Sequence, residues 1–228
     1  MQFKIYDVLA SLIPGTLVLG VLLITLLGIN GDIWVDKLLK FKDFSAILTS
    51  LFLVTSYLIG YIIHALGSWF EPILWFTWGG RPSELLLKNK SNRLRMYEHE
   101  NAFNFLIARS KMEAKVPDEL SSQDFKDLYQ IAKNLAFVKA DGSIKERISE
   151  FNNSYIFSRN ILIAFLSIII AYITWAYYAF VYWWGIIFLF IALLILWYRC
   201  RDKAFYYSRE IITAAYFLKE KGLSDTNI

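Results

Sequence analysis

The order of apolar and charged positions divides the chain into long uncharged runs and one mixed region. Residues 8–31, 44–70 and 160–198 contain no Asp, Glu, Lys or Arg. A helix of about 20 apolar residues crosses a bilayer, and the third run is long enough for two such helices. The pattern therefore predicts four transmembrane helices in an all-α bundle.

The expected spans one and two cover residues 8–29 and 44–69. Spans three and four form a hairpin whose turn lies near Tyr178–Gly185, where aromatic residues are dense. Aromatic rings favour the boundary between lipid and water, so this cluster indicates a membrane interface. A kink is expected in span one at Pro14–Gly15.

Residues 71–159 form a mixed insert between spans two and three, and its pattern is helical throughout. A first helix is expected over residues 83–115 and a second over residues 121–140. Ser143 followed by Glu146 is a capping box that opens a third helix, which continues directly into span three.

The helical pattern also continues beyond span four, so this span and the tail are predicted to form one long helix. Its apolar stripe must pack against the insert or against another subunit. The chain is thus expected to contain spans one and two (1–70), a cytosolic helical insert (71–159), a transmembrane hairpin (160–198) and a cytosolic C-terminal helix (199–228).

Lysine and arginine positions predict the orientation in the membrane. The insert holds fourteen basic residues and the tail six, whereas the turn between spans three and four holds none. The positive-inside rule then places both termini and the insert in the cytosol of a multi-pass protein of the bacterial inner membrane.

Composition narrows the function classes. The chain is 57% hydrophobic with a net charge of +4, which favours neither nucleic acid nor anionic lipid as a partner. Its single cysteine, Cys200, excludes an internal disulfide and a multi-cysteine zinc site. No Gly-rich phosphate loop, nucleophile elbow or HExxH motif is present. We expect no enzyme activity, no cofactor and no metal site.

Span two carries small and hydroxyl-bearing residues within a narrow sector of its helical surface, and one ionisable residue near its cytosolic end. Such a stripe allows close packing of helices in lipid, and it could also line a narrow hydrated path in an oligomer. Both interpretations stay open for the pore-lining or helix-packing set, which consists of Ser45, Thr49, Ser56, Gly60, His64 and Gly67.

The first part of the insert, and the region just before Pro117, carry basic side chains interleaved with aromatic ones. This combination could bind a nucleotide or a short single strand through charge and stacking. It could equally face anionic headgroups or serve as a solvated surface. The candidate ligand-binding residues are Lys88, Lys90, Arg93, Arg95, Arg109 and Lys111.

Short motifs in three places resemble small bacterial membrane proteins of anti-phage defence operons. They are Tyr6–Asp7 with Leu12–Ile13–Pro14–Gly15, then Gly60–Tyr61–Ile62–Ile63–His64, and Phe157–Ser158–Arg159–Asn160 at the entry to span three. The chain is similar to the channel-forming effector of Hailong-type systems and, as a second candidate, to the membrane component of Kiwa-type systems. The first resemblance implies a channel whose partner enzyme makes a nucleotide-based ligand.

The expected function is therefore an oligomeric inner-membrane effector, an ion channel gated by a cytosolic nucleotide-type ligand, which depolarises the membrane in anti-phage defence. The expected partners are membrane lipid, further copies of the chain (a tetramer is favoured), a nucleotide or short oligonucleotide, and a soluble operon partner. The alternative is a non-conducting membrane sensor or scaffold that recruits a soluble partner.

Overall fold

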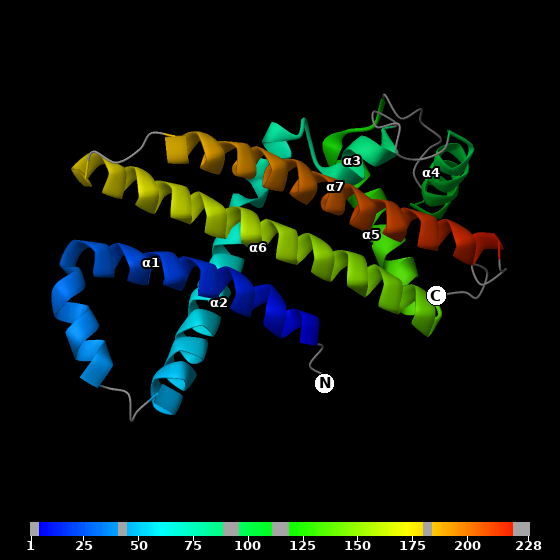
Figure 1. Ribbon diagram of the computed structural model, residues 1–228. Helices are drawn as coiled ribbons and strands as arrows, with labels where there is room; N and C mark the ends of the chain where they lie inside the picture. Colours follow the sequence, from blue (N-terminus) through cyan, green and yellow to red (C-terminus); the bar gives the residue numbers. More distant parts are fainter. Residues whose placement is uncertain (1–4, 41–44, 89–95, 111–118, 180–183, 221–228) are drawn as a thin grey trace. The chain divides into compact units, whose positions relative to one another are not determined.

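The computed structural model describes residues 5–40, 45–88, 96–110, 119–179 and 184–220. These residues form seven α-helices and no strand (Figure 1), which confirms the prediction of an all-α chain. The helices are α1 (Ile5–Lys40), α2 (Ser45–Thr77), α3 (Pro82–Leu87), α4 (Met96–Ser110), α5 (Ser122–Lys139), α6 (Gly142–Ala179) and α7 (Trp184–Glu220).

The chain divides into two compact units. The first unit consists of Met1–Glu71 and Ile156–Cys200, and the second unit consists of Pro72–Tyr155 and Arg201–Ile228. Helices α2, α6 and α7 each contain one of the three boundaries and continue through it without a break.

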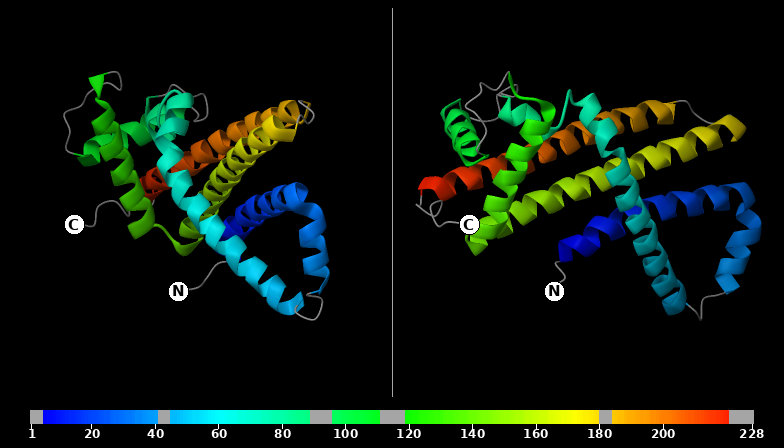
Figure 2. Two further views of the ribbon diagram at one scale, coloured as in Figure 1. Left: turned by 90° about the vertical axis from the view of Figure 1, so that its left-hand side faces the viewer. Right: turned by 180° about the vertical axis from the view of Figure 1, so that it is seen from behind.

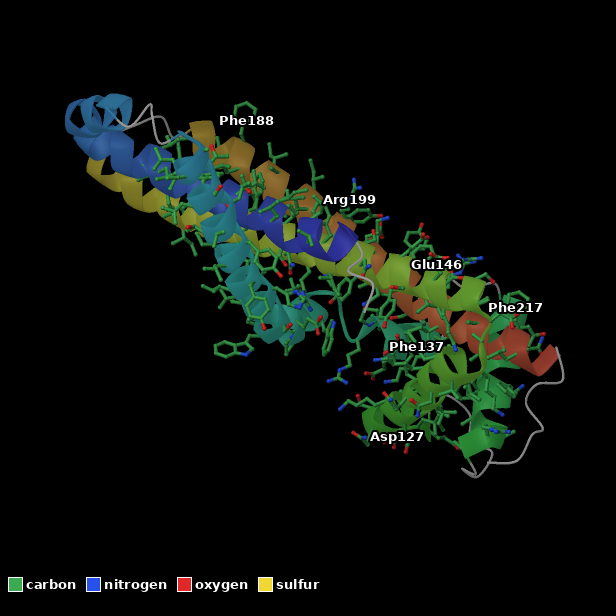
Figure 3. The ribbon with its side chains drawn as sticks, turned by 90° about the horizontal axis from the view of Figure 1, so that it is seen from below. Asp127, Phe137, Glu146, Phe188, Arg199 and Phe217 are labelled. Carbon is green, nitrogen blue, oxygen red and sulfur yellow. The ribbon has the colours of Figure 1, made fainter. Side chains whose placement is uncertain are left out.

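Three stretches are apolar enough to cross a bilayer by length and composition, namely Val8–Thr25, Ala46–Leu87 and Gly142–Ile173. Many large apolar side chains of the first unit point outward, as Phe188 of α7 does in Figure 3 with 72% of its surface exposed. A surface of this kind is typical of a protein surrounded by lipid. The chain is accordingly a membrane protein.

No stretch of α7 is among these three candidates in the described part of the chain. The four-span bundle with a cytosolic domain therefore stays a prediction.

Helices α1 and α2 of the first unit cross in backbone contact (Figure 2). A Cβ atom added to Gly15 would collide with the carbonyl oxygen of Ser56, and one added to Gly60 would lie 2.5 Å from the carbonyl carbon of Ser11. Only glycine lets the two helices approach this closely, because it has no side chain at the contact. Ile63 of α2 forms a small core with Ile163 and other apolar side chains next to this crossing.

The segment after span one differs from its expected structure. Residues 30–40 were expected to belong to the loop between spans one and two, but α1 is a single helix of 36 residues that ends at Lys40. Its only proline, Pro14, lies near its beginning, so no proline interrupts the helix over the expected loop. Figure 1 shows that α1 changes direction in its second half.

The second unit has an apolar core to which five helices contribute. Leu86 of α3, Leu106 of α4, Leu128 of α5, Ile148 of α6 and Ile211 of α7 are all fully buried in it. The apolar stripe of the tail thus packs against the insert, which is one of the two alternatives expected from the sequence. Within this unit α6 and α7 are also joined by an ion pair between Arg147 and Glu210 at 2.6 Å.

The helix starts of the insert are partly as predicted. Ser121 caps α5 through a capping box, in which its hydroxyl accepts a hydrogen bond from the Asp124 N–H at 3.2 Å. The cap predicted at Ser143 is wrong, because α6 begins at Gly142 and the Asp141 carbonyl accepts the first hydrogen bond, from the Lys145 N–H at 3.1 Å. Asp is as favourable as Ser before a helix, so a start directly after Asp141 is as compatible with the sequence as one directly after Ser143.

The long helices predicted on either side of the hairpin are confirmed. Helix α6 runs for 38 residues from the insert into the third uncharged run, and α7 runs for 37 residues from the later part of the same run into the tail.

The single first helix expected over residues 83–115 is wrong. Helix α3 ends at Leu87 with Lys88 as its C-cap, and a separate helix, α4, begins at Met96. Pro82 starts α3 at its first position, and three successive leucines then anchor this short helix to the core.

Candidate functional site

Four polar side chains of the first unit meet between α2 and α6. His64 and Glu71 come from α2, while Arg159 and Asn160 are neighbours on α6. Arg159 is 4% exposed and Asn160 is completely buried. Ionisable groups inside a packed membrane unit are costly, so such a group with a named partner is a functional-site hypothesis by default. We call these four residues the polar cluster.

The ion pair between Glu71 and Arg159 is the strongest interaction in the polar cluster. Arg159 Nη1 donates to Glu71 Oε1, and the side chain of Glu71 retains 22% of its exposure. Gly67 makes room for the guanidinium group, because a Cβ atom at this position would lie 2.9 Å from Arg159 Nε. Breaking a buried pair leaves one charge without compensation, so this contact binds α2 and α6 together.

Asn160 connects the polar cluster to α1. Its Nδ2 donates to the Ala10 carbonyl of α1 at 3.0 Å and lies 3.4 Å from His64 Nδ1 of α2. Its other side-chain atom, Oδ1, is buried and accepts no hydrogen bond from the described residues. A buried acceptor without a donor costs about 1–3 kcal/mol, which makes this arrangement unfavourable for packing alone.

Cys200 borders the polar cluster from α7. Its side chain is completely buried, and both Arg159 and Glu71 act on its thiol electrostatically. Burial raises the pKa of this thiol, which lies beyond the last apolar residue of the expected span four, to about 12. The thiol is therefore protonated and unreactive in the folded protein.

The structure brings together part of the stripe predicted on span two. Ser56, Gly60 and Gly67 are buried against α1 or α6 of the same chain, and His64 belongs to the polar cluster. Ser56 Oγ has no hydrogen-bond partner among the described residues.

Thr49 lies beyond the crossing of α1 and α2, in an open apolar groove of about 470 Å³ between them. The side chain of Ser45 lies outside the described residues.

The predicted ligand-binding residues are mostly outside the described part of the chain, since Lys90, Arg93, Arg95 and Lys111 lie there. Lys88 is described, and it is engaged within the second unit. Its Nζ atom forms an ion pair with Glu84 at 2.6 Å and lies 4.8 Å from the centre of the Phe125 ring. A phosphate at Lys88 would have to displace Glu84.

Arg109 lies in the last turn of α4 and is half-buried. Among the residues that the structure describes, no three His, Cys, Asp or Glu side chains are grouped as metal ligands would be.

Sequence reasoning identified only His64 of the polar cluster. Glu71 and Arg159 each lie just outside an uncharged run, a position typical of charges that flank a membrane. The sequence does carry one signal for this pair. The two residues have opposite charges, and they lie at the ends of two spans that the expected orientation places on the same side of the membrane. Helices that continue past the uncharged runs, with a glycine at the contact, turn these flanking charges into a buried pair.

No relative of this chain adds information about the site. No protein-family model, no curated protein and no solved structure matches this chain.

Proposed function

We propose that this protein is the protomer of an oligomeric inner-membrane effector that leaks ions when its cytosolic helical domain rearranges. The observation that carries the proposal is the course of α6. One continuous helix of 38 residues contains Arg159 of the polar cluster and also contributes Ile148 to the core of the second unit. A shift of that helix can pass from the helical domain into the membrane, because a helix transmits displacement as a rigid element.

The ion pair between Glu71 and Arg159 acts in this proposal as a latch. While the pair is intact, α2 and α6 stay together, and the polar face of α2 from Ser56 to Glu71 is closed by α1 and α6. Opening the latch would expose that face to water. A path lined by Ser56, Gly60 and His64, without rings of charge, would discriminate weakly among small ions.

The proposal includes four spans, with both termini and the helical domain in the cytosol. We expect reporter fusions after Asp118 and at the C-terminus to report cytosol, and a fusion at Asp36 to report the periplasm, because of the distribution of lysine and arginine. An enzyme reporter that is active on only one side of the membrane gives the reading. A periplasmic signal after Asp118 would overturn the orientation and with it any cytosolic ligand.

Conduction is tested with purified protein in liposomes loaded with a potential-sensitive dye. The wild-type chain should stay closed, and Arg159→Gln, which removes the charge of the latch, should dissipate an imposed potassium gradient. Arg199→Gln is the matched control, because Arg199 is an exposed arginine of the same unit. Equal permeability of the two variants would contradict the latch. If no variant dissipates the potassium gradient, even with candidate nucleotides and oligonucleotides added, conduction itself is contradicted.

The ligand and the defence role belong to the same proposal. The resemblance to defence effectors supports a nucleotide-type ligand, and the basic residues from Lys90 to Arg95 are its candidate contacts. Lys88 is poorly suited to this role, since Glu84 already neutralises it. Opening in cells would depolarise the membrane and stop growth.

A recruiting scaffold is the second candidate, and one observation favours it. The outer face of α5 is polar over most of its length but ends in Phe137 and Val138, which are 40% and 69% exposed. An exposed apolar end on a polar helix suits a protein partner. Under this candidate, Phe137→Ser would abolish recruitment while every liposome experiment stays silent.

A further inference from the structure

Two N–H donors from α6 converge on one ring nitrogen of His64. Arg159 Nη2 and Asn160 Nδ2 both lie 3.4 Å from His64 Nδ1. Arginine can only donate a hydrogen bond. The Asn160 amide must also present its NH₂ group here, because the same nitrogen donates to the Ala10 carbonyl at 3.0 Å. His64 Nδ1 is therefore the acceptor, and the proton of the neutral ring lies on Nε2.

A second proton on the ring would remove this acceptor. Nδ1–H would then face two donors, and the ring would carry a positive charge beside the Arg159 guanidinium. The other ionisable groups near the ring are few among the described residues. Glu71 of α2 attracts a charged ring from two helical turns away, while α7 contributes the neutral Cys200 thiol next to the ion pair. From the described part of α1, the Ala10 carbonyl takes part.

We propose that protonation of His64 releases the contact between α2 and α6. The neutral ring accepts hydrogen bonds from Arg159 and Asn160 and holds α6 in place, whereas the protonated ring releases both. Glu71 lies just outside the uncharged run of α2 and is partly exposed, so we infer that protons enter the cluster from this end of the run.

The sign of the pH effect follows from this geometry. The contact is intact above the range where histidine ordinarily titrates, about pH 6.5, and is lost as the pH falls through and below it. This inference rests on the proposed function for its consequence, which is that acidification on the side of the helical domain favours the leaking state.

The reactivity of the Cys200 thiol reports on this contact, and measuring it does not require the protein to conduct ions. It is the single cysteine of the chain and is completely buried beside Arg159 and Glu71. The reaction rate of its thiol with a dipyridyl disulfide is measured in detergent from pH 8 to pH 5. The rate in denatured protein at each pH corrects for the chemistry of the reagent. The corrected rate of the full-length wild type should rise as the pH falls, by up to about tenfold per pH unit, which is the limit for one linked proton.

His64→Gln provides the matched comparison, because glutamine keeps an acceptor oxygen but takes up no proton. We expect its corrected rate to stay low and independent of pH. A wild-type rate that does not change, or a change that His64→Gln shares, would overturn the inference.

Nitrogen-15 labelling of histidine gives a second measurement that needs no substitution at His64. Its signal is assigned by removing the other histidine with His99→Gln. At pH 8 the spectrum should show the proton of His64 on Nε2, and a proton on Nδ1 would overturn the inference.

Liposome measurements separate this inference from the proposed function. If Arg159→Gln conducts but the reaction rate of the Cys200 thiol does not depend on pH, the proposed channel is supported and the proton switch is contradicted. If the thiol rate depends on pH but no variant conducts, the proton switch is supported and the proposed channel is contradicted.

Discussion

Replacing Gly60 by alanine is expected to destabilise the first unit strongly, as is the same change at Gly15 on the other side of the crossing. The new Cβ would collide with the Ser11 carbonyl oxygen, and that atom belongs to the backbone of a helix, which cannot move aside as a side chain can. Overpacking of a tight contact costs about 1–3 kcal/mol. Gly60→Leu should prevent α1 and α2 from packing at all. Thermal unfolding of the purified chain in detergent measures both effects.

Gly20→Ala is the matched control on α1. A Cβ atom at Gly20 meets nothing within 4 Å, so the substitution should be neutral or stabilise the helix by up to about 1 kcal/mol through the better helix propensity of alanine. If Gly60→Ala unfolds at the same temperature as Gly20→Ala, α1 and α2 do not cross in backbone contact.

Removing Arg159 is the second substitution with a large expected effect. Arg159→Met deletes the positive charge and leaves the Glu71 carboxylate between α2 and α6 without its partner. Breaking a buried ion pair in this way costs about 3–5 kcal/mol. We expect the lower end of this range, because the Glu71 side chain remains 22% exposed. The free energy of unfolding in a denaturing detergent measures the loss, and Arg199→Met should change it by less than about 0.5 kcal/mol.

A double substitution distinguishes a paired charge from lost packing. Glu71→Leu combined with Arg159→Met replaces both charges by apolar groups, and such a replacement is often neutral or stabilising. The double variant should therefore be more stable than Arg159→Met alone, and it should lose less stability than the sum of the two single variants. A double variant that loses the sum of the two single effects would show that the two side chains do not interact.

Periodicity in the sequence determined the helical content of this protein and much of its connectivity. The uncharged runs identified the apolar helices, and the pattern beyond each run predicted that α6 and α7 continue into the insert and the tail. The capping box at Ser121 was also readable, because its two residues are three positions apart and interact locally. Such features depend on neighbours in the chain, so they need no knowledge of the fold.

Several boundaries depended on the tertiary structure. The segment after Leu87 resembles a helix in its charge pattern, yet α3 ends there, with its leucines packed in the core of the second unit. Helix α1 likewise continues to Lys40 through an expected loop. A pattern of polar and apolar residues does not determine where a helix ends when capping and packing compete with it.

The polar cluster was decided by tertiary structure alone. Glu71 and Arg159 are separated by 88 positions, and each looks like an ordinary flanking charge in its own segment. The stripe on α2 was visible, but its partners, the Ser11 carbonyl and the Arg159 side chain, come from other helices. Periodicity tells which face of a helix is small or polar, whereas the residues opposite that face are set by how the helices cross, and this crossing depends on contacts far apart in the sequence.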